Sequence, residues 1–150
     1  MKRSLCLAAL ALSLILQNTA GAADSASAEA VVQRQLDAYN ARDIDAFLAT
    51  YSDDVELLNF PATPRSKGKD AMRTRYARLF GDTTLRATVS QRMTLENTVI
   101  DREHIKLMSP QGPATLNAVA IYEVKDGKIA KVTFISAPPQ LDSGAAIVRP

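Results

Sequence analysis

Cysteine, histidine and tryptophan are scarce in this sequence. One cysteine, one histidine and no tryptophan occur among its 150 residues. A zinc site needs several histidine, cysteine or carboxylate ligands that converge, and a disulfide needs two cysteines. The sequence also lacks a glycine-rich phosphate loop and a dinucleotide-binding fingerprint. We therefore expect a protein that works without a metal or another cofactor.

An excess of charge of one sign is also lacking. Lysine and arginine number 18, and aspartate and glutamate number 16. Two of the basic residues, Lys2 and Arg3, lie in a segment that we expect to be removed. The remaining chain is close to neutral, which gives no support for nucleic-acid binding.

The first 23 residues have the layout of a secretory signal peptide. Two basic residues precede an apolar run over 5–16, and Ala20-Gly21-Ala22 forms a cleavage site of the A-x-A kind. The apolar run is too short to span a bilayer comfortably. We therefore predict a periplasmic or secreted protein without a membrane segment after cleavage. Cys6 would leave with the leader, and the mature chain would have no cysteine.

Apolar residues at helical spacing predict three helices in the first half of the chain. The predicted helices run from Ser25 to a break at 40–43, over 44–51, and from residue 69 to a stop at Gly81. A strand over 55–60 separates the second helix from the third. It is expected to end at Pro61 and Pro64 and to continue into a polar loop over 63–69.

Alternating apolar residues predict strands in the second half. These strands cover 84–97 and 98–108, and a hairpin over 114–136 turns at the Asp-Gly pair within 125–128. The order predicts an α+β fold, with three helices on one face of a curved antiparallel sheet. We place the domain at residues 24–137 and expect a flexible tail over 138–150.

Three segments carry a resemblance to a known family. They are AVVQRQLDAYNARDIDAFLATYSDDVEL (30–57), KGKDAMRTRYARLF (67–80) and AVAIYEVKDGKIAKVTFI (118–135). With them the chain resembles the nuclear transport factor 2-like superfamily, which includes SnoaL-like polyketide cyclases and ketosteroid isomerases. The resemblance implies a cone-shaped α+β barrel with a deep, mostly apolar cavity. It also implies a homodimer formed through the outer face of the sheet.

The usual isomerase residues are replaced at the matching positions. In the ketosteroid isomerases an aspartate base takes a proton next to a ketone, and a tyrosine and a protonated acid hold the enolate oxygen. By the resemblance, the tyrosine falls on Gln35, the base on Asn59 and the protonated acid near Ala120. A supporting tyrosine falls on Tyr76 and is kept. The resemblance therefore implies an isomerase scaffold without the usual isomerase residues.

The cavity wall is predicted from alternation and from the resemblance. Leu57 and Asn59 share one face of the first strand if that strand alternates, and we expect this face to look into the cone. The residues expected to bind the ligand are Tyr39, Tyr51, Leu57, Asn59, Tyr76, Phe80, Met93, Asn117 and Val119.

The segment IDREHI carries the candidate catalytic groups. On a strand, Asp101 and Glu103 share one face, and Arg102 shares the other with His104, the only histidine. A carboxylate buried on the concave face would have a raised pKa and could act as a base. The alternative is a solvated outer face or a set of cross-strand ion pairs.

Three functional hypotheses remain open. In the first, an exported protein binds a small, largely apolar molecule in its cone. In the second, a cofactor-independent isomerase, cyclase or hydrolase uses Asp101 or Glu103 as its base. In the third, a non-catalytic module works through the outer face of its sheet. The basic segment from Arg65 to Arg78 is expected to be a solvated face, although Arg73 or Arg75 near the mouth of the cone could contact an acidic ligand.

Overall fold

The computed structural model describes residues 27–144. The predicted signal peptide therefore lies outside the described residues. Within the described range, none of the helices has the length and the apolar character that crossing a membrane would require.

In the described part of the chain, three helices form where apolar residues recur at helical spacing. They are α1 (Ala28–Ala41), α2 (Ile44–Ala49) and α3 (Lys69–Leu79). The side chain of Ser27 caps α1 by accepting a hydrogen bond from the Ala30 N–H at 3.2 Å. Asp43 caps α2 in the same way, with bonds of 2.9 and 3.1 Å. Such caps satisfy backbone donors that the first turn of a helix leaves free.

Within residues 27–144, seven strands form a single sheet. They are β1 (Tyr51–Asn59), β2 (Thr63–Lys67), β3 (Arg86–Leu95), β4 (Thr98–Ser109), β5 (Gly112–Lys125), β6 (Lys128–Ser136) and β7 (Gln140–Leu141). The sheet order is β2-β1-β6-β5-β4-β3, and β7 pairs with the first half of β5 beyond the end of β6. All pairs are antiparallel except β1 with β6. The expected α+β architecture with a curved sheet is confirmed, with one parallel pair added.

Three local predictions differ from the structure. Thr63–Lys67 is the edge strand β2 rather than a loop, because an edge strand tolerates a proline such as Pro64. Tyr51 begins β1 rather than ending the second helix. The segment after residue 137 is not wholly a loose tail, because Gln140–Leu141 pairs with β5. Residues 145–150 lie outside the described part of the chain.

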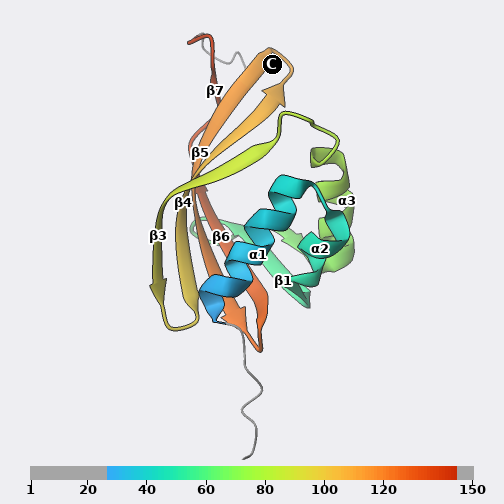
Figure 1. Ribbon diagram of the computed structural model, residues 1–150, viewed down its shortest axis with the longest axis vertical. Coiled ribbons are helices and arrows are strands. Elements are labelled where there is room, and N and C mark those ends of the chain that lie inside the picture. Colours follow the sequence, from blue (N-terminus) through green and yellow to red (C-terminus); the bar gives the residue numbers. More distant parts are fainter. Residues whose placement is uncertain (1–26, 145–150) are drawn as a thin grey trace, which may run out of the picture.

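The helices cover the concave face of the sheet (Figure 1). Where the helices meet the sheet, an aromatic cluster surrounds Phe47, which is fully buried. Its ring centroid lies 4.6 Å from that of Tyr76, 5.0 Å from that of Tyr51 and 5.4 Å from that of Phe80. Aromatic pairs at such distances contribute beyond the area that they bury. The cluster fixes the tyrosine rings that reach toward the interior of the cone.

A side-chain clamp joins α1 to the edge strand β3. The Asn40 amide donates to the Ala87 carbonyl at 3.0 Å and accepts from the Ala87 N–H at 2.8 Å. Ala87 is buried and lies on the edge strand of the sheet. Asn40 therefore pairs two backbone groups that would otherwise be buried without partners.

We expect Asn40→Ala to lower the free energy of unfolding by about 1–3 kcal/mol, because it leaves these buried backbone groups without hydrogen-bond partners. Urea denaturation measures the change. Arg34→Ala, on the exposed face of the same helix, is the matched control and should stay within about 0.5 kcal/mol of the parent protein. An equal loss in the two variants would show that the clamp contributes nothing specific.

Candidate active site: a cavity with a buried glutamate

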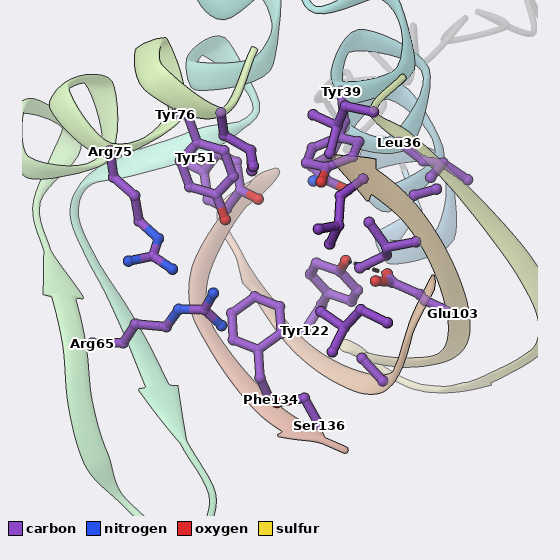
Figure 2. A pocket seen from close by; sticks show the side chains of 18 residues that line it. Leu36, Tyr39, Tyr51, Arg65, Arg75, Tyr76, Glu103, Tyr122, Phe134 and Ser136 are labelled. Atoms are coloured by element: carbon purple, nitrogen blue, oxygen red, sulfur yellow. Dashed lines mark hydrogen bonds between the residues drawn. The ribbon is translucent and has the colours of Figure 1, made fainter. Parts of the chain in front are cut away.

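The cone encloses a cavity of about 170 Å³ between the concave face of the sheet and the helices (Figure 2). Residues from α1, α3 and most strands of the sheet line it, and most of the wall is apolar. The main apolar residues are Leu36, Leu79, Leu85, Ile105, Leu107 and Phe134. The remaining wall carries a few polar groups, which decide what chemistry the cavity can perform.

Glu103 is the only carboxylate that lines this cavity among the described residues. Its side chain comes from β4 and is only 5% exposed. The Tyr122 hydroxyl donates a hydrogen bond to Glu103 Oε1 at 2.8 Å, and no lysine or arginine forms a salt bridge with it within residues 27–144 (Figure 2). Burial raises the Glu103 pKa to about 7, and the hydrogen bond from Tyr122 partly opposes this rise. A carboxyl group with such a pKa can both take and give a proton near neutral pH.

Asp101 lies on the same face of β4 but in a different environment. Its two oxygens accept hydrogen bonds from Arg92 Nε and Nη2, both at 2.7 Å. Arg92 also donates to Gln33 of α1 at 2.9 Å. Asp101 is 1% exposed and does not line the cavity. The expected shared face is therefore present, but only Glu103 of the two lines the cavity.

Tyrosine hydroxyls form a second group of polar atoms in the wall. Tyr39, Tyr51 and Tyr76 all line the cavity, as expected of them. Burial raises the pKa of each, and the hydroxyls therefore remain protonated donors. Gln35 partly opposes the rise of the Tyr51 pKa, and the hydroxyl groups of Tyr39 and Tyr76 have no hydrogen-bond partner within residues 27–144.

Two arginines line the cavity near α3. Arg75 comes from that helix and Arg65 comes from β2. Leu57 pairs with Ser66 and Leu58 with Pro64, which leaves Arg65 as the extra residue of a β-bulge. The Arg65 guanidinium lies 4.8 Å from the centroid of the Phe134 ring. Figure 2 shows the two guanidinium groups beside each other, across the cavity from Glu103.

The first strand contributes less to the cavity than the sequence suggested. Leu57 is fully buried in the core and Asn59 is exposed, and neither lines the cavity. Asn59 pairs with Thr63 and Phe134 at the end of β1. Phe134 and the bulged Arg65 occupy the wall there, which leaves Asn59 outside it.

Four other predicted ligand-binding residues lie elsewhere. Phe80 packs against Tyr39, with ring centroids 5.5 Å apart, and supports the wall from behind. Met93 pairs with Ile100 on the outer face, 57% exposed, after a bulge between Val89 and Gln91 shifts the register. Asn117 and Val119 point outward because they pair with His104 and Arg102. Paired residues in an antiparallel ladder share a face of the sheet. Because Glu103 points inward, its chain neighbours Arg102 and His104 point outward, and their partners Val119 and Asn117 point outward with them.

Tyr122 and Arg65 are polar residues of the wall that the sequence analysis did not predict. Tyr122 could have been found, because it alternates with Ala118 and Ala120 on the face of β5 opposite to Asn117. Arg65 could not, because a regular register would have placed its side chain on the other face of β2.

Comparisons with known proteins agree with this fold. A model of the SnoaL-like domain family matches residues 32–132. A cystatin-fold protein from Novosphingobium aromaticivorans is 25% identical, covering 73% of this chain and 97% of its own, with a TM-score of 0.67. A Δ5-3-ketosteroid isomerase from a Mycobacterium species is 23% identical over 73% and 92%, with a TM-score of 0.64. An LEH-like epoxide hydrolase of M. tuberculosis is 19% identical over 73% and 82%, also at 0.64. A search of curated proteins gives no match.

Proposed function

Because the chain belongs to the SnoaL-like domain family, we propose that it is a cofactor-independent enzyme that binds a small, largely apolar molecule and exchanges a proton with it through Glu103. One observation carries the proposal. Glu103 is a buried carboxyl group that lines an apolar cavity, receives a hydrogen bond from Tyr122 and has no cationic partner within residues 27–144. Buried carboxyl groups with shifted pKa values cluster at catalytic sites.

The proposed step is an isomerisation by proton transfer. The ionised Glu103 carboxylate removes a proton from the carbon next to a carbonyl group, and the electron pair of that C–H bond forms an enolate. Tyrosine hydroxyls of the wall, from Tyr39 or Tyr76, donate hydrogen bonds to the enolate oxygen. In a ligand with a carbon–carbon double bond β,γ to the carbonyl group, the enolate extends over that double bond, and the protonated Glu103 returns the proton to the γ carbon while the double bond moves next to the carbonyl group. The apolar wall keeps water from competing for that proton.

A purely binding protein is the weaker candidate. A carboxyl group without a cationic partner is costly to bury in its charged form, and a cavity that only holds an apolar ligand has no need of one. A pKa of about 7 also suits an acid–base group at neutral pH. The family resemblance supports either role, since one fold carries many functions.

Deuterium exchange tests the proposal even while the natural substrate is unidentified. The protein is incubated in D₂O with a panel of small cyclic ketones and enones, and NMR follows the loss of α-protons. We expect accelerated exchange for at least one compound, with loss of the acceleration in Glu103→Gln. Glu123→Gln, an exposed glutamate of β5, is the control and should retain it. Equal rates for the parent and Glu103→Gln across the panel would reject the proposal.

The outer face of the sheet supports a homodimer as part of the same proposal. Met93, Ile100 and Ile121 are neighbours across three strands, and Val119 pairs with Ile135 beside them. Met93 is 57% exposed and Ile135 45%. A contiguous apolar strip of this kind marks an interaction surface. A second copy of the chain offers the same strip, which suits a two-fold interface.

We expect Ile135→Glu to convert a dimer into a monomer, because it would place two carboxylates in the centre of the apolar contact. Light scattering after size-exclusion chromatography measures the mass. Ala71→Glu adds the same charge on the exposed face of α3 and should leave the dimer intact. A monomeric parent protein would reject the homodimer, and a dimer that survives Ile135→Glu would place its interface elsewhere.

The proposal also keeps the expectation of export. Its support is the sequence of residues 1–23, with basic residues, an apolar run and a small-residue cleavage site. The site would then act in the periplasm or outside the cell.

A further inference from the structure

The two arginines of the cavity wall have no acidic partner within residues 27–144. Neither Arg65 nor Arg75 forms a salt bridge in that range. Three neighbouring cations do have an acidic partner. Lys67 pairs with Glu56, Lys69 with Asp53 and Arg73 with Asp45, each at 2.8 Å. Arg78 of α3 also forms no salt bridge within the described residues, but Arg65 and Arg75 are the two such cations that line the cavity.

The arrangement is unfavourable for an empty cavity. Arg65 is half-buried, and both its burial and the positive charge of Arg75 lower its pKa. Two guanidinium groups held near each other repel, and an anion between them would remove that repulsion. Planar guanidinium groups also match the geometry of a carboxylate.

The cavity has a second polar end in Glu103. The charged groups that influence the Glu103 pKa are Asp101 and Arg92, and neither arginine of the cavity wall is among them. Apolar side chains, including Leu79, Ile105 and Phe134, line the space around these two ends. A ligand that fills the cavity would therefore meet cations at one end and the acid–base group at the other.

The size of the cavity limits the ligand. Its volume is about 170 Å³, and a protein cavity of roughly 150 Å³ holds one benzene molecule. The enclosed part of the ligand is therefore about one ring in size, with room for a short polar arm toward the arginines.

We infer that the ligand is a compact organic acid, whose carboxylate lies between Arg65 and Arg75 and whose single-ring apolar body extends toward Glu103. The inference rests on the proposed function, since it names the class of molecule that would reach the proton-transfer group. The carboxylate would hold the ligand in one orientation and present its far end to Glu103.

Matched ligand pairs test the inference separately from catalysis. The probes are cyclohexanecarboxylate and benzoate with their neutral amides, and calorimetry measures their binding to the Glu103→Gln protein. We expect each acid to bind about ten- to a hundredfold more tightly than its amide, and this preference to weaken with added salt. Arg65→Met and Arg75→Met should each reduce the preference, and the double variant should remove it.

Arg73→Met is the matched control, because Arg73 lies on α3 near Arg75 but pairs with Asp45. It should keep the full preference for acids. Arg75 is exposed, and its replacement should leave the fold intact even if Arg65→Met fails to fold. Equal binding of acids and amides, no binding of either acid, or an equal loss in Arg73→Met would overturn the inference. Acid binding without deuterium exchange in the parent protein would reject the proposed function and leave this inference standing.

Discussion

Replacing Glu103 by glutamine is expected to stop proton transfer in the cavity and, at the same time, to stabilise the protein above neutral pH. Positioned general bases contribute about 10²- to 10⁴-fold to a reaction rate, and we expect turnover to fall by that factor. Glutamine keeps the shape of the side chain and can still accept the hydrogen bond from Tyr122. The loss would therefore report the proton acceptor rather than the shape of the cavity.

The gain in stability follows from the raised pKa. The Glu103 pKa is about 7 in the folded protein against an ordinary value of 4.5. The folded protein therefore holds this proton more tightly than the unfolded chain. The resulting stabilisation is complete below pH 4.5 and is lost as the pH rises to about 7. The difference between these two pKa values corresponds to a free energy on the order of 3 kcal/mol.

Urea denaturation at several pH values measures this effect. The free energy of unfolding of the parent protein, compared with that of Glu103→Gln, should fall between pH 4.5 and about 7 and then level off. A constant difference between the two proteins over this range would mean that Glu103 does not titrate there. Tyr122→Phe offers an independent check, since the Tyr122 hydrogen bond lowers the Glu103 pKa. Its loss should move the rise of kcat/KM with pH to higher pH.

Arg92→Met is expected to lower the free energy of unfolding by about 3–5 kcal/mol, because it leaves a buried carboxylate without its partner. Asp101 is 1% exposed and receives two hydrogen bonds from Arg92. Arg92 itself is only 14% exposed at its side chain, so water can replace little of this interaction. Chemical denaturation near neutral pH measures the loss.

The double variant Arg92→Met with Asp101→Leu is the informative control. Replacing both members of a buried ion pair by apolar residues is often neutral, so much of the lost stability should return. A double variant as unstable as Arg92→Met alone would show that the pair is needed for more than mutual neutralisation. The hydrogen bond from Arg92 to Gln33, which joins β3 to α1, would then be the next contact to test.

The family and the helices could be predicted from the sequence because they depend on local signals. The capping aspartate Asp43, the helical spacing of Val31, Val32 and Tyr39, and the Asp126-Gly127 turn all act over a few residues. The structure confirms each of them, with positive φ angles of 50° and 70° at the turn. The match of the SnoaL-like domain model to residues 32–132 confirms the resemblance.

The cavity wall was harder to predict because it depends on register. Alternation placed Asp101 and Glu103 together correctly, yet the same alternation requires Asn117 and Val119 to point outward once the strands are paired. Pairing between strands is not visible in a single strand. Ion pairing is equally hidden, since Arg92 and Asp101 are separated by a turn in the sequence and become partners only through β3 and β4. The sequence therefore suggested two candidate bases, and the structure brings one of them into the cavity.

The β-bulge in β2 makes the charge of the cavity wall sensitive to chain length. Without the extra residue, Arg65 would pair with Leu58 and its side chain would turn to the opposite face of the sheet. Deleting one residue from this edge strand could therefore remove a cation from the cavity without any substitution in the wall. Among relatives of this chain, a one-residue gap in this segment would change which ligands the cone admits, and a gapless alignment would hide that change.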